Sequence, residues 1–194
     1  MLAEEDRQAI NAMLDFWFAE DTRPRWYQST KAFDELCRER FGQLVERAAN
    51  GDLADWEGSA EGALALCLLL DQMPRNLFRG TSKAFATDGD AVAVAARAID
   101  KGFDQTLDNE RRTFLYLPFQ HSEDLAQQER SVVLSTALGD DKFLDYAVEH
   151  ADIVRRFGRF PHRNAILGRV STPEEQAFLA DGAKSYGQGS SDDK

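Results

Sequence analysis

The balance between alanine, leucine and the β-branched residues constrains the fold of this chain more than any other feature. Alanine and leucine together number 46, whereas valine, isoleucine and threonine together number 20. Alanine and leucine lose little side-chain freedom in a helix, whereas β-branched residues suit the pleated surface of a sheet. The sequence therefore predicts an all-α fold.

Apolar residues at helical spacing, together with residues that start and stop helices, predict about eight helices. Ser29 or Thr30 is expected to cap the second helix and Asp88 the fourth, while Pro74 and Pro118 are expected to end helices. The expected helices cover residues 4–18, 30–49, 59–73, 88–99, 108–117, 122–138, 140–156 and 172–180. Helices of this length with short connections pack as stacked antiparallel pairs, in a bundle or a short solenoid.

The length predicts one domain, over residues 1–182, because a chain of 194 residues can bury one substantial core. Its last helix has the clearest start, since Thr172 to Glu175 combine an N-cap, a proline at the first helical position and a capping-box glutamate. Residues 183–194 are small, polar and glycine-rich, and they predict a disordered tail.

Charge and apolar runs argue against several partners and locations. A formal net charge of −11 disfavours non-specific attraction to nucleic acid or to anionic lipid. The longest apolar run, residues 63–70, is too short to span a bilayer, and the acidic start lacks the pattern of an export signal. Cys37 and Cys67 have no metal-like spacing and indicate no disulfide framework. We therefore expect a cytoplasmic protein with no membrane partner and of undetermined oligomeric state.

A first polar segment follows the longest apolar run. Asp71 and Gln72 stand where a polar side chain must find a partner or line a cavity. Arg75 and Arg79 come next at a spacing of about one helical turn, with Asn76 between them. Two interpretations are open: the segment lines a binding site, or an aspartate or asparagine fixes a turn while an arginine neutralises it.

A second segment surrounds Pro118, where one helix is expected to end shortly before another begins. His121 would then lie in a bend beside free backbone N–H groups, which favour an anion. His121 and Glu123 are candidates for a general acid–base couple, since histidine titrates near neutrality. The structural alternative is that Ser122 caps a helix, Glu123 interacts with the helix dipole and His121 bonds a carbonyl. For Glu123 we favour this structural alternative.

The third segment, residues 153–173, holds five arginines and one histidine but no aspartate or glutamate. This is anomalous in a chain of net charge −11. The planar fork of arginine suits carboxylate and phosphate groups. Stabilisation of a helix C-terminus explains Arg155 and Arg156, but it does not explain Arg159 and His162. The pattern therefore favours a functional role.

The three histidines of the chain, His121, His150 and His162, all lie in its second half. With Asp71 or Glu123 they would supply metal-binding side chains, but no pair has the i,i+4 helical spacing or the H-E-x-x-H pattern that makes a metal site specific. We therefore predict no metal and no cofactor, and we expect His150 to be a packed or surface residue.

Three motifs together resemble an uncharacterised bacterial family, the domain of unknown function numbered 924. The motifs are residues 70–81, 118–123 and 156–164, and residues 14–18 and 171–175 also resemble the family. The resemblance covers nearly the whole chain except the tail. It implies a tetratricopeptide-like, all-helical fold, and it implies no activity. The family pattern often has an apolar residue where this chain has Gln120.

The leading hypothesis is that the three segments converge on one polar pocket that binds a small anionic ligand, in a binding protein or in an enzyme. His121 and His162 are the candidates for proton transfer, with Asp71 or Glu123 to orient one of them or accept a proton. The predicted ligand-binding residues are Gln72, Arg75, Asn76, Arg79, Arg156, Arg159, Arg163 and Asn164.

Three alternatives remain open. A tetratricopeptide-like scaffold would hold an acidic peptide in an open groove, whereas a closed pocket would favour a small molecule. RNA binding through residues 155–169 is disfavoured by the overall charge. In a purely structural polar core, Arg159→Ala or His162→Ala would lower the melting temperature and change no binding property.

Overall fold

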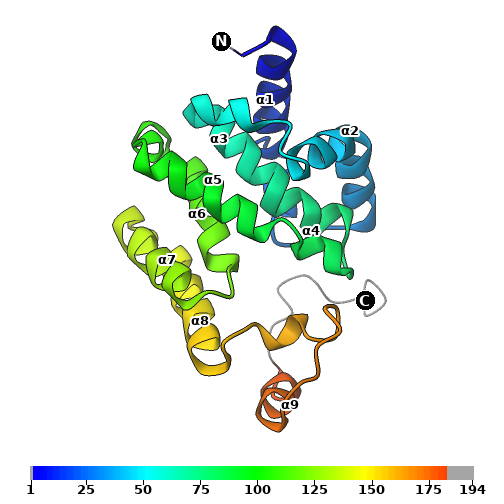
Figure 1. Cartoon of the computed structure of the whole chain (residues 1–194), viewed down its shortest axis with the longest axis vertical. Coiled ribbons are helices and arrows are strands. Elements are labelled where there is room, and N and C mark those ends of the chain that lie inside the picture. The colour runs from blue at the N-terminus through cyan, green and yellow to red at the C-terminus, as the bar shows by residue number, and fades with distance from the viewer. Residues whose placement is uncertain (1, 183–194) are drawn as a thin grey trace.

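A computed structural model describes residues 2–182 of the chain. Within that part every regular element is helical, which confirms the predicted all-α fold (Figure 1). The α-helices are α1 (Glu4–Trp17), α2 (Lys31–Ala49), α3 (Ala60–Cys67), α4 (Met73–Leu77), α5 (Asp88–Asp100), α6 (Asn109–His121), α7 (Leu125–Leu138), α8 (Asp141–Phe157) and α9 (Pro173–Ala180). A π-helical turn, η3 (Leu68–Gln72), joins α3 to α4, so α3, η3 and α4 form one continuous helix. Counted in this way, the described residues form the eight helices that were expected. The predicted tail, residues 183–194, lies outside the described residues.

Most of the predicted helix starts are confirmed, because side chains cap them as expected. Thr30, Asp108 and Asp140 each accept a hydrogen bond from a backbone N–H in the first turn of the helix that follows. Thr172 and Glu175 form the predicted reciprocal capping box before α9. A capping side chain satisfies backbone donors that a helix start otherwise leaves without partners.

Two predicted caps are wrong. Asp124 rather than Ser122 caps α7, and its carboxylate already occupies the helix start at which we expected a free anion site. Thr87 precedes α5, and Asp88 is the first helical residue instead of the cap. The Asp88 carboxylate is bound by two arginines that come from elsewhere in the chain, which local sequence patterns do not reveal.

Pro74 does not end the third helix, contrary to the prediction. A proline inside a helix removes one N–H donor and crowds the carbonyl four residues earlier, here that of Leu70. The π-helical turn accommodates this defect, and the Thr87 hydroxyl donates to the Leu70 carbonyl at 2.5 Å. The apolar run therefore continues into α4, with Pro74 in the first turn of that helix.

We expect Thr87→Val to lower the free energy of unfolding by about 1–2 kcal/mol. Valine keeps the shape of threonine but cannot donate to the Leu70 carbonyl, and an unpaired buried carbonyl costs free energy of this order. Urea denaturation of the parent and the variant measures the difference. Thr106→Val serves as control, because Thr106 donates its hydroxyl bond from an exposed position.

Pro118 does not interrupt its helix either, so a second predicted end is wrong. Helix α6 continues through it to His121 and is buried from Phe114 to Gln120. A proline within a helix costs about 3 kcal/mol, and burial of aromatic side chains such as Phe119 offsets a cost of that size. As a result His121 is the last residue of a helix, whereas we had expected it in a bend between helices.

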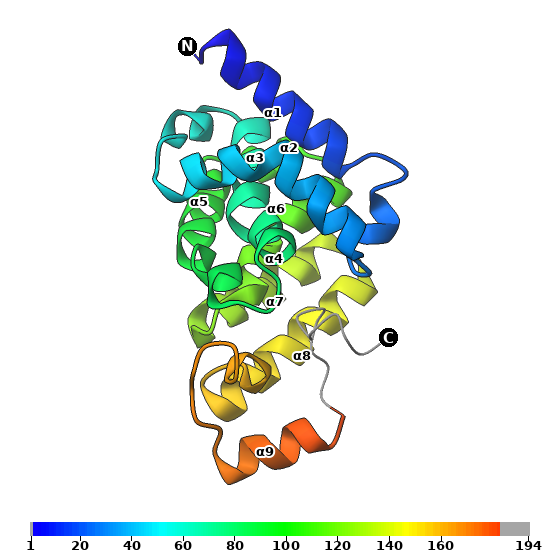
Figure 2. The same ribbon diagram turned by 90° about the vertical axis from the view of Figure 1, so that its right-hand side faces the viewer.

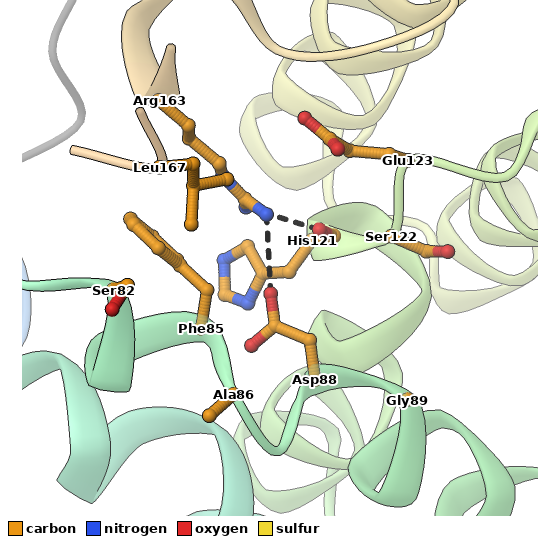
Figure 3. A pocket seen from close by; sticks show the side chains of 10 residues that line it. All are labelled: Ser82, Phe85, Ala86, Asp88, Gly89, His121, Ser122, Glu123, Arg163 and Leu167. Atoms are coloured by element: carbon orange, nitrogen blue, oxygen red, sulfur yellow. Dashed lines mark hydrogen bonds and ion pairs between the residues drawn. The ribbon is translucent and has the colours of Figure 1, made fainter. Parts of the chain in front are cut away.

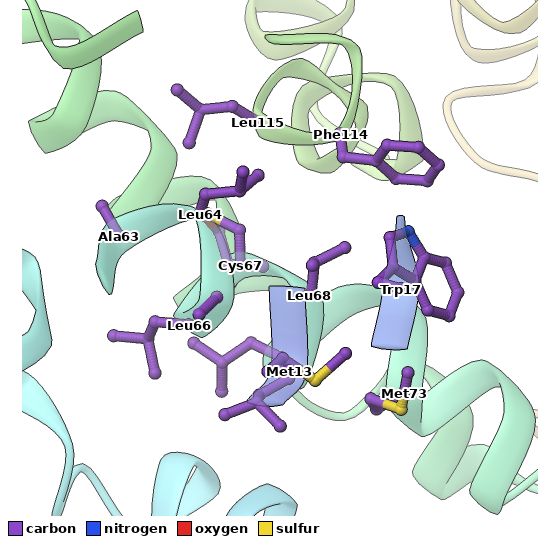
Figure 4. Close-up of a cluster of buried hydrophobic side chains, with 14 of the residues drawn as sticks. Met13, Trp17, Ala63, Leu64, Leu66, Cys67, Leu68, Met73, Phe114 and Leu115 are labelled. Carbon is purple, nitrogen blue, oxygen red and sulfur yellow. The ribbon is translucent and has the colours of Figure 1, made fainter. Parts of the chain in front are cut away.

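The hydrophobic core surrounds α3, which is buried from Gly62 to Cys67, as its continuous apolar run predicts. Figure 4 shows Leu64 of α3 and Leu68 of η3 in one buried cluster with Trp17 of α1 and Phe114 of α6. The Trp17 and Phe114 rings meet edge to face, with centroids 5.6 Å apart. Helices α6, α7 and α8 then pack one against the next (Figure 1).

The chain leaves α8 at Gly158, whose φ of 69° suits glycine, and continues through the 3₁₀ turn η6 (Pro161–Arg163) to α9. Phe160 of this C-terminal segment, residues 158–182, forms a small core with Ile153 and Val154 of α8, separate from the main core. Figure 2 shows α9 at the far end of the molecule from α1. The tetratricopeptide-like arrangement remains a prediction.

Within the described residues, no helix has both the length and the apolar character needed to cross a membrane.

Candidate functional site

One pocket lies where the C-terminal segment meets the main helical body. Its volume is about 280 Å³. The wall is formed by the α4–α5 connection, the first turn of α5, the end of α6 and the η6 region (Figure 3). The lining residues are Ser82, Phe85, Ala86, Asp88, Gly89, His121, Ser122, Glu123, Arg163 and Leu167.

A hydrogen bond between His121 and Asp71 fixes the imidazole that faces this pocket. The Nδ1 atom of His121 lies 2.7 and 3.0 Å from the two carboxylate oxygens of Asp71, which is 1% exposed. An ionised carboxylate accepts hydrogen bonds and cannot donate them, so Nδ1 carries the proton. The other nitrogen, Nε2, has no partner among the described residues. Figure 3 shows the ring projecting from the end of α6 toward Phe85, with Asp88 and Arg163 beside it.

Two aspartates and two arginines form a buried cluster beneath the pocket. Arg75 binds both carboxylate oxygens of Asp88 at 2.9 and 3.0 Å, and it lies 3.0 Å from Asp71. Arg163 donates to Asp88 at 3.1 Å and to the backbone carbonyl of His121 at 3.0 Å. The four charges cancel, which is the usual condition for burying charged groups.

Aromatic rings hold the guanidinium group of Arg163 in place. Its central carbon lies 4.5 Å from the centroid of the Phe85 ring and 4.6 Å from that of Phe160. Contacts of this kind favour arginine over lysine, because the planar group stacks on a ring face. Phe85 thus both lines the pocket and supports its arginine.

The surroundings keep Asp71 ionised and His121 neutral. Burial by itself would raise the pKa of Asp71, but the Arg75 charge and the hydrogen bonds from His121 and Gln72 outweigh it and lower that pKa. Burial, reinforced by the charge of Arg75, lowers the pKa of His121 despite the opposing effect of Asp71. Burial also lowers the pKa of Arg163 to about 10, so this arginine stays charged at neutral pH.

The other two histidines lie close behind the pocket. The His150 ring centroid is 6.5 Å from that of His121 and 5.5 Å from that of Phe160, and the Phe160 centroid is 5.5 Å from that of His162. Burial lowers the pKa of His150 to about 4 and that of His162 to about 3, and both groups are therefore neutral at physiological pH. His150 bonds the Tyr146 carbonyl through Nδ1 and is packed, as expected.

The structure brings together one or two residues from each of the three segments. Asp71 and Arg75 come from the first, His121 from the second and Arg163 from the third. Asp88, the residue that links both arginines, was missed by sequence reasoning. An aspartate at a helix start is normally explained as a cap, so no sequence signal distinguishes this one.

The remaining predicted residues of the first segment bind within the scaffold. Arg79 holds the carboxylate of Asp34 with two hydrogen bonds of 2.7 and 3.0 Å, which ties the end of α4 to α2. Asn76 accepts from Arg79 and donates to the backbone carbonyl of Gln72. Gln72 donates to the Asp71 carboxylate. Gln72 thereby makes a hydrogen bond to the carboxylate that also holds His121.

Glu123 pairs with Arg169 and not with His121, so neither predicted role for Glu123 describes its contacts. Arg169 donates two hydrogen bonds to this carboxylate at 2.6 and 2.8 Å, and the Phe160 N–H donates a third at 2.7 Å. Arg169 also donates to Asn164 at 2.9 Å. These bonds fasten the C-terminal segment to the connection between α6 and α7.

The two predicted arginines nearest the end of α8 bind acidic side chains of α9. Arg159 makes a two-pronged ion pair with the buried carboxylate of Glu175, at 2.7 and 2.9 Å, and lowers the pKa of Glu175 to about 2. Arg156 contacts Glu174 at the surface, with about half of each side chain exposed. Neither arginine belongs to the pocket wall.

Residues 2–182 contain no group of three or more histidine, cysteine, aspartate or glutamate side chains arranged to hold a metal ion.

Comparisons with known proteins agree with the resemblance noted in the sequence. A family model for bacterial proteins of unknown function, DUF924, matches residues 13–183. A solved structure of a protein of unknown function from Agrobacterium tumefaciens is 45% identical, with a TM-score of 0.87 over 91% of this chain and 99% of that chain. No curated protein matches the sequence significantly. The chain belongs to the DUF924 family of bacterial proteins of unknown function.

Proposed function

We propose that the pocket binds a small anionic molecule and that His121 exchanges a proton with it. The observation that carries this proposal is the hydrogen bond from His121 Nδ1 to the buried Asp71 carboxylate, in a histidine that lines the pocket. This bond leaves the lone pair of Nε2 for a ligand. Histidine oriented by a carboxylate is a recurrent arrangement for general acid–base chemistry.

The chemistry of such a pair is proton transfer to or from an oxygen, sulfur or nitrogen atom. Neutral His121 accepts a proton at Nε2 from a hydroxyl group, a thiol or a water molecule in the pocket. Asp71 stabilises the imidazolium ion that forms, without itself taking the proton. A correctly placed group of this kind contributes about 10²–10⁴-fold to a reaction rate. Among the described residues no hydrogen bond joins His121 to a serine or cysteine side chain, and in this proposal the substrate or water supplies the reacting atom.

The first turn of α5 supports an anionic ligand. Thr87 makes no side-chain capping bond to α5, and no hydrogen bond from another described side chain to the backbone N–H groups of that turn is present. Gly89 lines the pocket there, and a Cβ atom at this position would meet no described protein atom within 4 Å. Free N–H groups at a helix start favour a carboxylate or phosphate. Because the Asp71, Asp88, Arg75 and Arg163 charges cancel, attraction of an anion depends on these local donors.

The size of the pocket favours a small molecule over a peptide. Sites for drug-sized ligands measure about 300–1,000 Å³, and this pocket, at about 280 Å³, lies just below that range. Phe85 and Leu167 supply an apolar wall for the non-polar part of the ligand. Cys37 and Cys67 are both buried free thiols, which fits a reducing compartment such as the bacterial cytoplasm.

We expect a ligand of this class to raise the melting temperature of the purified protein by on the order of 5 °C at a concentration one hundred times its Kd. The measurement is a thermal-shift screen of small carboxylates, phosphorylated metabolites and nucleotides. Hits are repeated on His121→Asn, which removes the Nε2 base, and on Gly89→Leu, which fills the pocket beside α5. Arg156→Gln is the control, because Arg156 lies at the surface away from the pocket.

The proposal stands if a hit stabilises the parent and Arg156→Gln but neither pocket variant. A hit that stabilises all four proteins equally binds elsewhere and contradicts it. If no small molecule stabilises the parent and an acidic peptide does, the scaffold alternative replaces it.

A further inference from the structure

The carbonyl groups at the end of α6, including that of its C-cap residue Ser122, need partners from outside the helix. A helix leaves its final carbonyls without intrahelical donors, and buried carbonyls must be satisfied in another way. The backbone N–H of Ser122 reaches back only to Phe119. The carbonyls of Gln120, His121 and Ser122 therefore depend on side chains from other elements.

Two side chains supply these donors. The side-chain amide of Gln128, on α7, donates to the Gln120 carbonyl at 2.7 Å and to the Ser122 carbonyl at 2.6 Å. Arg163 donates to the His121 carbonyl between them. Gln128 is fully buried, with 0% of its surface exposed. One amide group thus holds the backbone immediately before and immediately after the pocket histidine.

A neighbouring glutamine provides an internal comparison. Gln120 is also buried, at 2% exposure, and precedes His121 directly. Its Nε2 atom has no hydrogen-bond partner among the described residues. The two residues share side-chain type, burial and proximity to His121. They differ in that only Gln128 donates to the backbone beside the histidine.

We propose that Gln128 is a positioning residue for His121, which keeps the imidazole in register with the Asp71 carboxylate. This inference rests on the proposed role of His121 in proton transfer. The Nδ1–H···Asp71 bond spans 50 residues of sequence and requires the end of α6 to stay fixed relative to η3. A loosened α6 end releases the Nδ1 proton from Asp71, so the tautomer that presents the Nε2 lone pair to the pocket loses its advantage.

The test compares Gln128→Met with Gln120→Met by nuclear magnetic resonance of protein carrying ¹⁵N-labelled histidine. The chain has three histidines, so the variant His121→Asn identifies the His121 signals. We expect the parent and Gln120→Met to show a His121 that is protonated at Nδ1. In Gln128→Met the Nδ1 proton should exchange with water about tenfold faster, since loss of two buried hydrogen bonds shifts an opening equilibrium by at least this order.

Gln128→Glu is the second variant, in case Gln128→Met fails to fold. Glutamate keeps the size of glutamine, but burial favours its protonated form, which has one O–H donor in place of two N–H donors, so one backbone bond is lost and the same exchange should accelerate. A His121 tautomer and exchange rate equal to the parent in folded Gln128 variants would overturn the inference. An equal change in Gln120→Met would also overturn it, since the effect would then reflect general loosening of the core. The readout needs no ligand, so a failed ligand screen refutes the proposed function without deciding this test.

Discussion

Replacing Asp88 with alanine is expected to lower the free energy of unfolding by about 3–5 kcal/mol. Asp88 accepts two hydrogen bonds from Arg75 and one from Arg163, and all three side chains are at least 87% buried, since their exposed fractions are 13, 12 and 7%. Without this carboxylate, two buried guanidinium groups face a single remaining aspartate, Asp71. The loss of stability arises from the buried charge that is left without a partner, and it exceeds the net contribution of the intact ion pair to the free energy of unfolding.

The measurement is urea denaturation followed by circular dichroism, and the melting temperature should fall by roughly 6–20 °C. Asp90→Ala is the matched control, because Asp90 lies in the same first turn of α5 but is exposed. Removing Asp90 should change stability by no more than about 0.5 kcal/mol. A loss below about 1 kcal/mol in Asp88→Ala would mean that water or another group reaches the arginines, and the cluster would then not be a buried ionic core.

Acidification is expected to destabilise the protein, because two of its histidines are buried in the neutral form. Burial holds the pKa of His150 at about 4 and that of His162 at about 3 in the folded protein, whereas both are near 6.5 in the unfolded chain. The unfolded state therefore binds more protons as the pH falls below 6.5. The stability linked to these groups is fully present above pH 6.5 and is lost progressively as the pH falls toward the folded pKa values.

Between pH 6 and pH 5 the free energy of unfolding should fall by about 2 kcal/mol, since each of the two histidines contributes about 1 kcal/mol in this interval. The lowered pKa of His121 acts in the same direction. Urea denaturation at both pH values measures the change. The double variant His150→Gln, His162→Gln is expected to show a much smaller loss over the same interval. If its loss equals that of the parent, other groups cause the acid sensitivity.

These two predictions hold both for the proposed function and for its structural alternative, and the ligand screen separates the two. The ion cluster around Asp88 stabilises the protein whether or not a ligand binds, because its charges satisfy one another. Nε2 of His121 contributes nothing to that cluster. A polar core without a function would therefore reproduce the Asp88→Ala result, but it would not make ligand stabilisation depend on His121 and Gly89.

The sequence by itself determined the helical class and most helix boundaries of this protein. Caps such as Thr30 and the Thr172–Glu175 box act within one turn, so their effect is encoded locally. Pro74 and Pro118 were misjudged as helix ends because their local cost is offset by burial and, at Pro74, by a hydroxyl group from a distant residue. Tertiary packing decides whether such a local defect is tolerated.

The sequence also identified the three segments that meet at the pocket, because charged residues beside a buried apolar run must find partners. Only the tertiary structure decided which arginine meets which carboxylate. Arg75 and Arg163 share Asp88, whereas Arg79 and Arg159 bind Asp34 and Glu175 away from the pocket wall. The physical reason is the short distance over which an ion pair acts, because its energy depends on separations of a few ångströms. The paired residues are tens of positions apart in the chain, and the packing of the helices alone sets the distance between them.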